Sequence, residues 1–329
     1  MSNARNLAKV ITGNFNVPTG ALGNVQVTPA AVSDQANTST GYLMLPKGTS
    51  AQRPNSPVTG MVRFNTDLLY VEEYRQGQWS SVSNVFLAEG GTTSTYISNG
   101  INYKVHVFTS SSTFTVVAGT SSIDYLIIAG GGGGGHGAGA PQFAGGGAGG
   151  VVQGSTGVIS GVYPIIVGGG GSPYSNGSNS SAFGAATAIG GGAGGTGGGG
   201  AGGSGGSGGG QGGSGGALPN GQTRASGVSG QGNAGGAAVN NTTDAAGGGG
   251  GFSSAGQDGT TNTPGNGGTG LTSTITGTSL TYAGGGGRTD QGFRAGFIGS
   301  PNGVSNSGSG GGGNAGTGGS GVVIVRYQI

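Results

Sequence analysis

Apolar and polar residues alternate in three short stretches between residues 61 and 82, "MVRFN", "YVEEY" and "WSSV". Alternation with a period of two is typical of strands that bury one face, and the polar spacers between the stretches are short enough for hairpin turns. The pattern predicts a small three-stranded meander within residues 41–90. Because a sheet of this size is marginal by itself, we expect it to pack against copies of itself in an oligomer.

Longer apolar stretches follow from about residue 95. "YKVHVFT" and "STFTVV" are separated by serines that predict a hairpin turn, and "IDYLIIAG" is apolar almost without a break. A continuous apolar strand indicates that both of its faces are covered. Further strand-like pieces are "GVIS", "YPIIV" and "SLTY", and the chain ends on "GVVIVRYQI". The glycine-rich half of the chain therefore begins and ends with its best strands.

Glycine dominates between these strands. Only 11 of the 88 glycines precede Gly130, and runs such as 130–135, 145–150 and 190–216 recur towards the C-terminus. Within 193–217 the other residues keep a spacing of three, with occasional slips. Three residues per turn is the repeat of the polyproline II conformation, which has no internal hydrogen bonds. Its backbone groups must therefore pair with neighbouring chains.

This period predicts the fold class, which is mainly β with a polyglycine II helix bundle. A small N-terminal β-meander module precedes a C-terminal, β-framed glycine-rich domain. Interior helices are expected to be nearly pure glycine, and surface helices to carry a small residue at every third, exposed position. Gly199→Val is then expected to destabilise the bundle strongly if its helix is interior. The alternative is an unstructured Gly/Ser linker, whereas collagen is excluded because proline is nearly absent from the runs.

Charged side chains are scarce, and the formal net charge is only +2. A protein that binds nucleic acid through its charge needs a basic patch, so no nucleic acid is expected as a partner. The N-terminal "MSNARNLAKVITGNFNVPTG" lacks the apolar core of a signal peptide, and no stretch approaches the roughly 20 apolar residues of a membrane span. We expect synthesis in the cytoplasm without a signal peptide, and residues 1–40 to be an attachment segment or a partly ordered arm.

Loops of different composition interrupt the glycine runs and hold nearly all the aromatic and charged residues of this half. Recognition usually resides in loops on a rigid scaffold, and aromatic and arginine side chains are enriched at binding hot spots. For each aromatic residue the alternative is a side chain packed against the edge of the bundle. The best candidate is the stretch 288–297. The candidate receptor-binding residues are His136, Phe143, Tyr174, Arg224, Phe252, Asp258, Arg288, Asp290, Phe293, Arg294 and Phe297.

Catalytic chemistry has little support in the sequence. Glu72 and Glu73 are adjacent in a predicted strand, so their side chains point to opposite faces and cannot form the carboxylate pair of a glycosidase. The run Gly130–Gly135 lacks the Lys-Ser/Thr of a phosphate-binding loop, and neither zinc spacing nor a calcium repeat is present. We expect no enzyme activity, no catalytic residues, no metal and no cofactor.

The sequence also resembles a known family. "TFTVVAGTSSIDYLIIAGGGGGG", "YPIIVGGGGSPYSNGSNSSAFG" and "GGSGVVIVRY" resemble the glycine-rich domain at the C-terminus of many bacteriophage tail-fibre and adhesin proteins. "GYLMLPKGTSAQRPNSPVTGMVRFNTDLLYVEEYRQGQWSSV" resembles a small β module of tail fibres, especially those of marine phages. The resemblance implies a homotrimeric tail fibre or tail-tip adhesin of the virion.

The same resemblance implies partners and a division of the chain. The displayed loops would bind a cell-surface glycan or an outer-membrane protein of a bacterial host. Cyanobacteria and marine bacteria are among the hosts that the resemblance implies. Residues 1–40 would contact other virion tail proteins, 41–90 would be the tail-fibre-like module, and 91–329 the receptor-binding domain. The alternative is a self-associating structural filament or matrix protein, or an ice-binding protein, built on the same bundle.

Overall fold

The computed structural model describes residues 45–82, 86–135, 144–213, 224–239, 246–261, 263–287 and 302–329. The chain divides into two compact units, Met1–Leu45 and Pro46–Ile329, and the described residues belong almost entirely to the second. The predicted attachment segment, residues 1–40, lies outside the described residues.

Residues 46–82 form a four-stranded sheet, here called the N-terminal sheet. β2 (Val62–Asn65), β3 (Tyr70–Arg75) and β4 (Gln78–Ser81) are antiparallel neighbours in chain order. β1 (Lys47–Gly48) pairs in parallel with β2, and the 3-10 helix η1 (Ser50–Gln52) follows β1. The alternating stretches of the sequence therefore form the three antiparallel strands, and the parallel edge strand was not predicted.

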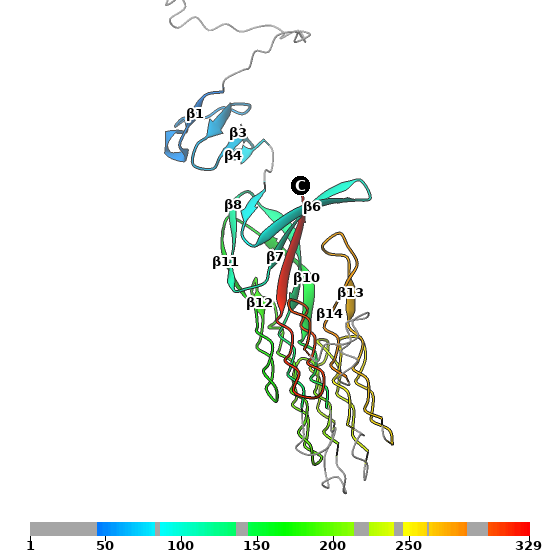
Figure 1. Ribbon diagram of the computed structural model, residues 1–329. Coiled ribbons are helices and arrows are strands. Elements are labelled where there is room, and N and C mark those ends of the chain that lie inside the picture. Colours follow the sequence, from blue (N-terminus) through cyan, green and yellow to red (C-terminus); the bar gives the residue numbers. More distant parts are fainter. Residues whose placement is uncertain are drawn as a thin grey trace, which may run out of the picture. The chain divides into compact units, whose positions relative to one another are not determined.

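Two larger sheets and one hairpin frame the glycine segments (Figure 1). β10 (Val151–Val158), β9 (Ser121–Ile128), β15 (Val322–Gln328), β7 (Ile101–Phe108) and β6 (Thr92–Ser98) form a five-stranded sheet in that order. β12 (Ser181–Ala182), β11 (Gly161–Ile166), β8 (Ser112–Ala118) and β5 (Leu87–Glu89) form a four-stranded sheet in that order. β13 (Leu271–Ser273) pairs with β14 (Leu280–Tyr282).

The inner strand β9, between β10 and β15, buries side chains on both faces of the five-stranded sheet. Ile123 and Ile127 join an apolar core that includes Phe114 of β8, in the four-stranded sheet. Leu126 and Ile128, on the opposite face, join a second core that includes Tyr282 of β14. The unbroken apolar stretch is therefore covered on both faces, as its sequence predicted.

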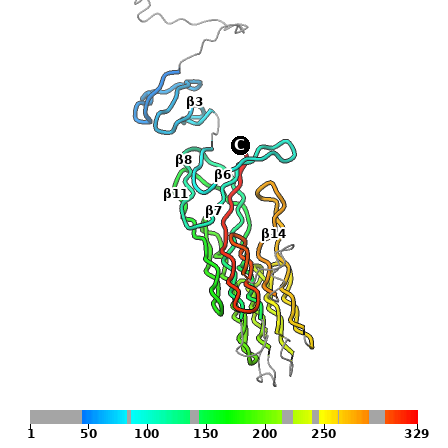
Figure 2. The backbone as a smooth tube through the Cα atoms, viewed as in Figure 1, coloured from blue at the N-terminus to red at the C-terminus, as the bar shows by residue number. Residues whose placement is uncertain are grey.

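Beyond β9 the chain continues into extended glycine segments that run alongside one another (Figures 1 and 2). The run Gly130–Gly135 is surrounded by other segments, and all six of its N–H groups and all six of its carbonyl groups are paired. Successive backbone groups of this run bond to different neighbouring segments, and every third residue bonds to the same segment. The N–H groups donate in rotation to segments 175–178, 316–319 and 144–147, and the carbonyl groups accept in rotation from segments 191–194, 171–174 and 311–315.

The interior of this array has no room for side chains. A Cβ atom built on any residue of Gly130–Gly135 would lie 1.9–2.1 Å from a backbone oxygen of a neighbouring segment. At the edge of the array, a Cβ atom on Gly169 would have no atom within 4 Å. Glycine is therefore required in the interior because the neighbouring backbones approach closely, and not because of its conformational freedom.

The described residues do not form the predicted polyglycine II helix bundle, so this part of the predicted fold class was wrong. The regular elements of the described residues are strands and the short helix η1, so the class is mainly β. The run 130–135 makes its backbone hydrogen bonds to other segments and none along itself. Its order is thus a property of the array, and a period of three in one segment does not establish a helix.

The predicted exposure of every third residue was also wrong in part. Ser204 is exposed, but Ser207 and Gln211, which belong to the same periodic stretch, are buried. The period of three relates Ser204 to Ser207, yet one is exposed and the other is buried, so the neighbouring segments decide which side chain faces solvent. Gly199 lies in a turn with φ 83°, so it does not test the interior of the array.

Candidate functional site

The glycine array has two ends that can be distinguished by their hydrogen bonds. At the sheet end, the Ala129 N–H donates to the Gly150 carbonyl over 3.0 Å, directly after β9 and directly before β10. At the opposite end, here called the distal end, the Gly135 N–H donates to the Ala144 carbonyl over 2.8 Å. Residues 136–143, which join this pair, lie outside the described residues.

Two other stretches outside the described residues begin or end at the distal end. Gly213 comes three residues after Gly210, whose N–H donates to the Gly145 carbonyl over 2.8 Å. Gly287 comes directly after Gly286, whose N–H donates to the Gly146 carbonyl over 2.8 Å. The chain therefore enters the stretches 214–223 and 288–301 from the level of Gly145 and Gly146.

A fourth stretch, 240–245, ends at the same level. Ala246 directly precedes Gly247, whose carbonyl accepts the Gly145 N–H over 3.2 Å. Four stretches of the glycine-rich half, 136–143, 214–223, 240–245 and 288–301, are thus attached to the distal end. In each case at least one of the two flanking segments is described and lies at that end. Two of them, 136–143 and 288–301, contain residues that the sequence singled out for recognition.

Most of the predicted binding residues fall in these stretches. His136, Phe143, Arg288, Asp290, Phe293, Arg294 and Phe297 lie outside the described residues. Tyr174, Arg224, Phe252 and Asp258 are described, and they do not form one cluster.

Arg224 and Asp258 form an ion pair whose two side chains are both about half exposed. The second carboxylate oxygen of Asp258, Oδ1, accepts the Ala237 N–H over 2.8 Å. The Asp258 carboxylate therefore accepts a hydrogen bond from the backbone of the array and also holds the Arg224 guanidinium group in place. An exposed arginine in a fixed position can donate hydrogen bonds to a carboxylate or phosphate ligand.

Gln211 is a buried polar residue of the array that the sequence pattern did not single out. Its Oε1 accepts the Ala238 N–H over 3.1 Å, next to the Ala237 N–H that Asp258 accepts. Its Nε2 is buried and has no hydrogen-bond partner among the described residues. The only signal in the sequence was a long polar side chain in a run of glycine, serine and alanine.

Tyr174 lies in a turn at a different place in the array. Its side chain is exposed, its φ is 65°, and its N–H donates to the Gly134 carbonyl over 3.2 Å. Gly134 is one residue from the distal end, so Tyr174 is attached close to that end by a segment other than those that hold Arg224 and Asp258.

Phe252 is a packing residue. It is partly buried against the second apolar core, and its N–H donates to the Ala283 carbonyl over 3.0 Å. Ala283 directly follows β14, which places Phe252 at the sheet end of the array. The alternative interpretation, an aromatic side chain packed against the edge, therefore applies to Phe252.

His106 of β7 also has a structural role. Its Nδ1 lies 2.6 Å from the Gly90 carbonyl oxygen, and its Nε2 lies 3.1 Å from the Tyr327 hydroxyl oxygen. Burial lowers the pKa of the imidazole and outweighs the opposite effect of the hydrogen bond to Gly90. Burial also raises the pKa of the Tyr327 phenol to about 12. Both groups are therefore held uncharged inside the core at neutral pH.

Among the described residues, no three His, Cys, Asp or Glu side chains come together as a metal site would require. In the same part of the chain, none of the helices has the length and apolar character to cross a membrane.

A family model described as "Glycine-rich domain" matches residues 107–328. The chain belongs to this family. The match runs from β7 through the whole glycine array to β15, and it includes all the candidate binding residues. No curated protein matches the chain. Membership of the glycine-rich domain family thus rests on the array and its framing strands, and the description of the family names no ligand.

Proposed function

We propose that the protein is a receptor-binding protein that presents recognition loops on the distal end of a rigid glycine array. One observation carries the proposal: described residues attach four stretches of irregular composition to the same end of the array. Because interior glycines accept no side chain, the array is a scaffold that leaves sequence variation to the loops. Arg224, fixed by Asp258, is the described side chain best suited to contact a ligand at this end.

The kind of receptor-binding protein follows from the resemblance to tail fibres. We infer a bacteriophage tail fibre or tail-tip adhesin, located in the virion and homotrimeric, with other tail proteins bound through the N-terminus. Its target is a glycan or an outer-membrane protein of a bacterial surface. Support comes from the tail-fibre-like sequence of residues 42–82 next to the glycine-rich domain. The function needs no catalysis, metal or cofactor.

The proposal is tested by cell decoration. Fluorescently labelled full-length protein is incubated with a panel of bacterial strains that includes marine and cyanobacterial species, and bound label is counted cell by cell. A variant with Arg288, Phe293, Arg294 and Phe297 all replaced by Ser is expected to lose the decoration. Its control replaces Val162 and Ile166, two exposed residues of β11, by Ser and is expected to retain decoration.

Two results would contradict the proposal. One is the absence of decoration on every strain. The other is equal decoration by the loop variant and the control, which would move recognition away from residues 288–297. Ordered polymers formed by the pure protein without cells would favour the alternative of a structural filament.

A further inference from the structure

The N-terminal sheet buries polar side chains fully and leaves its apolar side chains partly buried or exposed. Its buried side chains are Arg63, Asn65 and Glu72, and no large apolar side chain of residues 46–82 is buried. By contrast, Val58 is 62% exposed and Leu69 is 56% exposed. The apolar side chains of its strands are at most partly buried, so this sheet covers little apolar surface by itself.

A charged network occupies the covered half of one face. The Glu72 carboxylate is fully buried and accepts hydrogen bonds from Arg53 over 2.6 Å and from Asn65 over 3.0 Å. Arg63 lies 3.4 Å from the same carboxylate and donates to the carbonyl of Gln52. Burial opposes ionisation of Glu72, but the hydrogen bonds and positive charges outweigh it and lower its pKa. The network ties the η1 loop over this half of the sheet.

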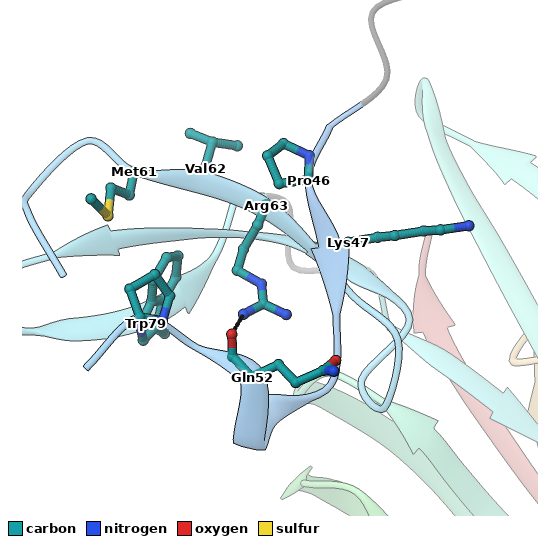
Figure 3. Close-up of a pocket in the computed structure, with 8 residues that line it drawn as sticks. Pro46, Lys47, Gln52, Met61, Val62, Arg63 and Trp79 are labelled. Atoms are coloured by element: carbon teal, nitrogen blue, oxygen red, sulfur yellow. Dashed lines mark hydrogen bonds between the residues drawn. The ribbon is translucent and has the colours of Figure 1, made fainter. Parts of the chain in front are cut away.

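The other half of the same face is open and apolar. It forms a pocket of about 440 Å³ whose walls include Met61, Trp79, Pro46 and Pro54. Figure 3 shows Met61 and Trp79 together on one side of Arg63, with Pro46 and Val62 above it. The Trp79 ring also packs at 5.5 Å from the ring of Tyr74. The pocket therefore offers a tryptophan, a thioether and prolines to an apolar side chain.

A matching apolar side chain projects from the opposite end of the β2–β3 hairpin. Leu69 lies in the turn between these strands, with φ 57°. A left-handed conformation is costly for leucine and is normally left to glycine or asparagine. The Asn65 carbonyl accepts the Leu69 N–H over 2.9 Å, and the Asn65 side chain accepts the Asp67 and Leu68 N–H groups. The turn thus holds an exposed leucine in a fixed position at a conformational cost, and such backbone strain is found most often at functional sites.

The four strands of the N-terminal sheet pair only with one another, so the small size of this sheet bears on what completes it. Units of fewer than about 40 residues usually need disulfides, a metal or oligomerisation to be stable. The chain contains no cysteine, and among the described residues no metal-binding group is present. A second copy of the chain is therefore the occupant that the composition favours.

We propose that Leu69 of a second copy inserts into the pocket formed by Met61, Val62 and Trp79. Leu69 and the pocket are at opposite ends of the β2–β3 hairpin, so each copy presents one apolar projection and one pocket. Such a contact is heterologous, and repeating it closes a ring when the rotation between copies divides a full turn, as the proposed trimer requires. The inference deepens the proposed homotrimer by naming its contact, and it needs no receptor.

The mass of the full-length protein in solution tests the contact. Sedimentation equilibrium is expected to give a closed oligomer of 30.8 kDa chains, three for the proposed trimer. Met61→Glu and Leu69→Lys are each expected to give monomers, because each buries a charge in the contact. The double variant Met61→Glu/Leu69→Lys is expected to associate again, since it places opposite charges across every contact. The control Val162→Glu alters an exposed apolar residue of β11 and is expected to leave the oligomer unchanged.

Trp79 provides a second readout, because it is the only tryptophan of the chain. Its emission is expected to shift to shorter wavelength as the wild-type protein associates, and the shift is expected to be absent in Leu69→Lys. Since the chain lacks cysteine, Met61→Cys/Leu69→Cys is expected to form intermolecular disulfides on oxidation, whereas neither single cysteine variant does.

Several outcomes would overturn the inference. They are a wild-type monomer at all concentrations, single variants that stay oligomeric, a double variant that fails to reassociate, or cross-linking by a single cysteine variant. If the protein is a monomer, a variant that lacks residues 1–40 distinguishes one further occupant. A shift of its Trp79 emission to longer wavelength would assign the pocket to the chain's own N-terminal segment. Loss of cell decoration with an intact oligomer would reject the proposed receptor function alone.

Discussion

The paired sheets and the glycine array are continuous in sequence but are held together by different atoms. In the sheets, Ile127 and Phe114 fill a core with side chains. A few residues later Gly130 has no side chain, and its backbone bonds to Ser178 and Gly191 of neighbouring segments. The sheets are thus stabilised mainly by apolar burial, and the array mainly by backbone hydrogen bonds between segments.

The difference has a consequence for tolerance to substitution. An apolar core adapts to exchanges that preserve volume, because its side chains can change rotamer. An array of touching backbones has no side chain to move, so one methyl group must displace a whole segment. We expect the largest effects in the array interior and the smallest at its exposed edge.

The largest effect is expected for Gly133→Ala. The new Cβ atom would lie 2.0 Å from the Ser172 carbonyl oxygen, and backbone cannot yield as a flexible side chain can. We expect a loss of more than about 4 kcal/mol in the free energy of unfolding, the range of exceptional single substitutions. The matched control is Gly169→Ala, which should change stability by no more than about 1 kcal/mol. Denaturant unfolding measures both, and equal effects would show that the interior is not closed.

A smaller effect is expected for Phe114→Ala in the core between the sheets. The ring is fully buried and lies 5.7 Å from Phe183 and 5.2 Å from His106, so its removal leaves a cavity. The expected loss is about 3–5 kcal/mol. Val162→Ala, at an exposed position of β11, is the control. A loss below about 1 kcal/mol for Phe114→Ala would mean that the sheets do not depend on this core.

The junction between the two regions should respond less strongly. The buried Ser180 hydroxyl donates to the Ile128 carbonyl over 2.9 Å and accepts the Gly168 N–H over 2.8 Å. Ser180→Ala leaves both backbone groups buried without this partner, at a cost of about 1–3 kcal/mol. Ser253→Ala is the control, because its hydroxyl donates to the Gly270 carbonyl at an exposed position. Thermal unfolding compares the two, and a larger effect for Ser253→Ala would contradict the assignment.

The smallest effect on stability is expected for Arg224→Ala. Its ion pair with Asp258 is half exposed, and such pairs contribute about 0.2–1 kcal/mol. The difference from wild type should shrink further at high salt, which screens exposed charges. If Arg224 contacts a receptor, the same variant should weaken cell decoration although its unfolding curve barely changes. A large stability loss that persists at high salt would instead make Arg224 a structural residue.

The strands could be predicted because their signals are local. Alternation marked the three antiparallel strands of the N-terminal sheet, and unbroken apolar runs marked β9 and β15. The parallel strand β1 was missed because two residues carry no period, and its pairing with β2 depends on the loop between them. The buried position of Glu72 was also hidden, since its partner Arg53 is 19 residues away in the chain.

The proposed binding site could be predicted from the sequence only as a set of loops. Composition singled out Phe252 together with Tyr174, but Phe252 packs on an apolar core whereas Tyr174 is exposed. Gln211 was overlooked because only its neighbours reveal a buried amide. Each of these outcomes depends on which segments lie side by side, and no local pattern carries that information.

The sequence by itself determined a mainly β class, the positions of the long strands and the membership in a glycine-rich family. Those properties depend on the period and composition of single segments. Only the tertiary structure decided which glycines are closed to a methyl group and which side chains of the stretch 193–213 are buried. It also decided that the described residues form no polyglycine II helix bundle. The reason is physical: glycine has no side chain to specify a partner, so its contacts are set by the strands that frame the array and by the backbones that happen to lie within hydrogen-bonding distance.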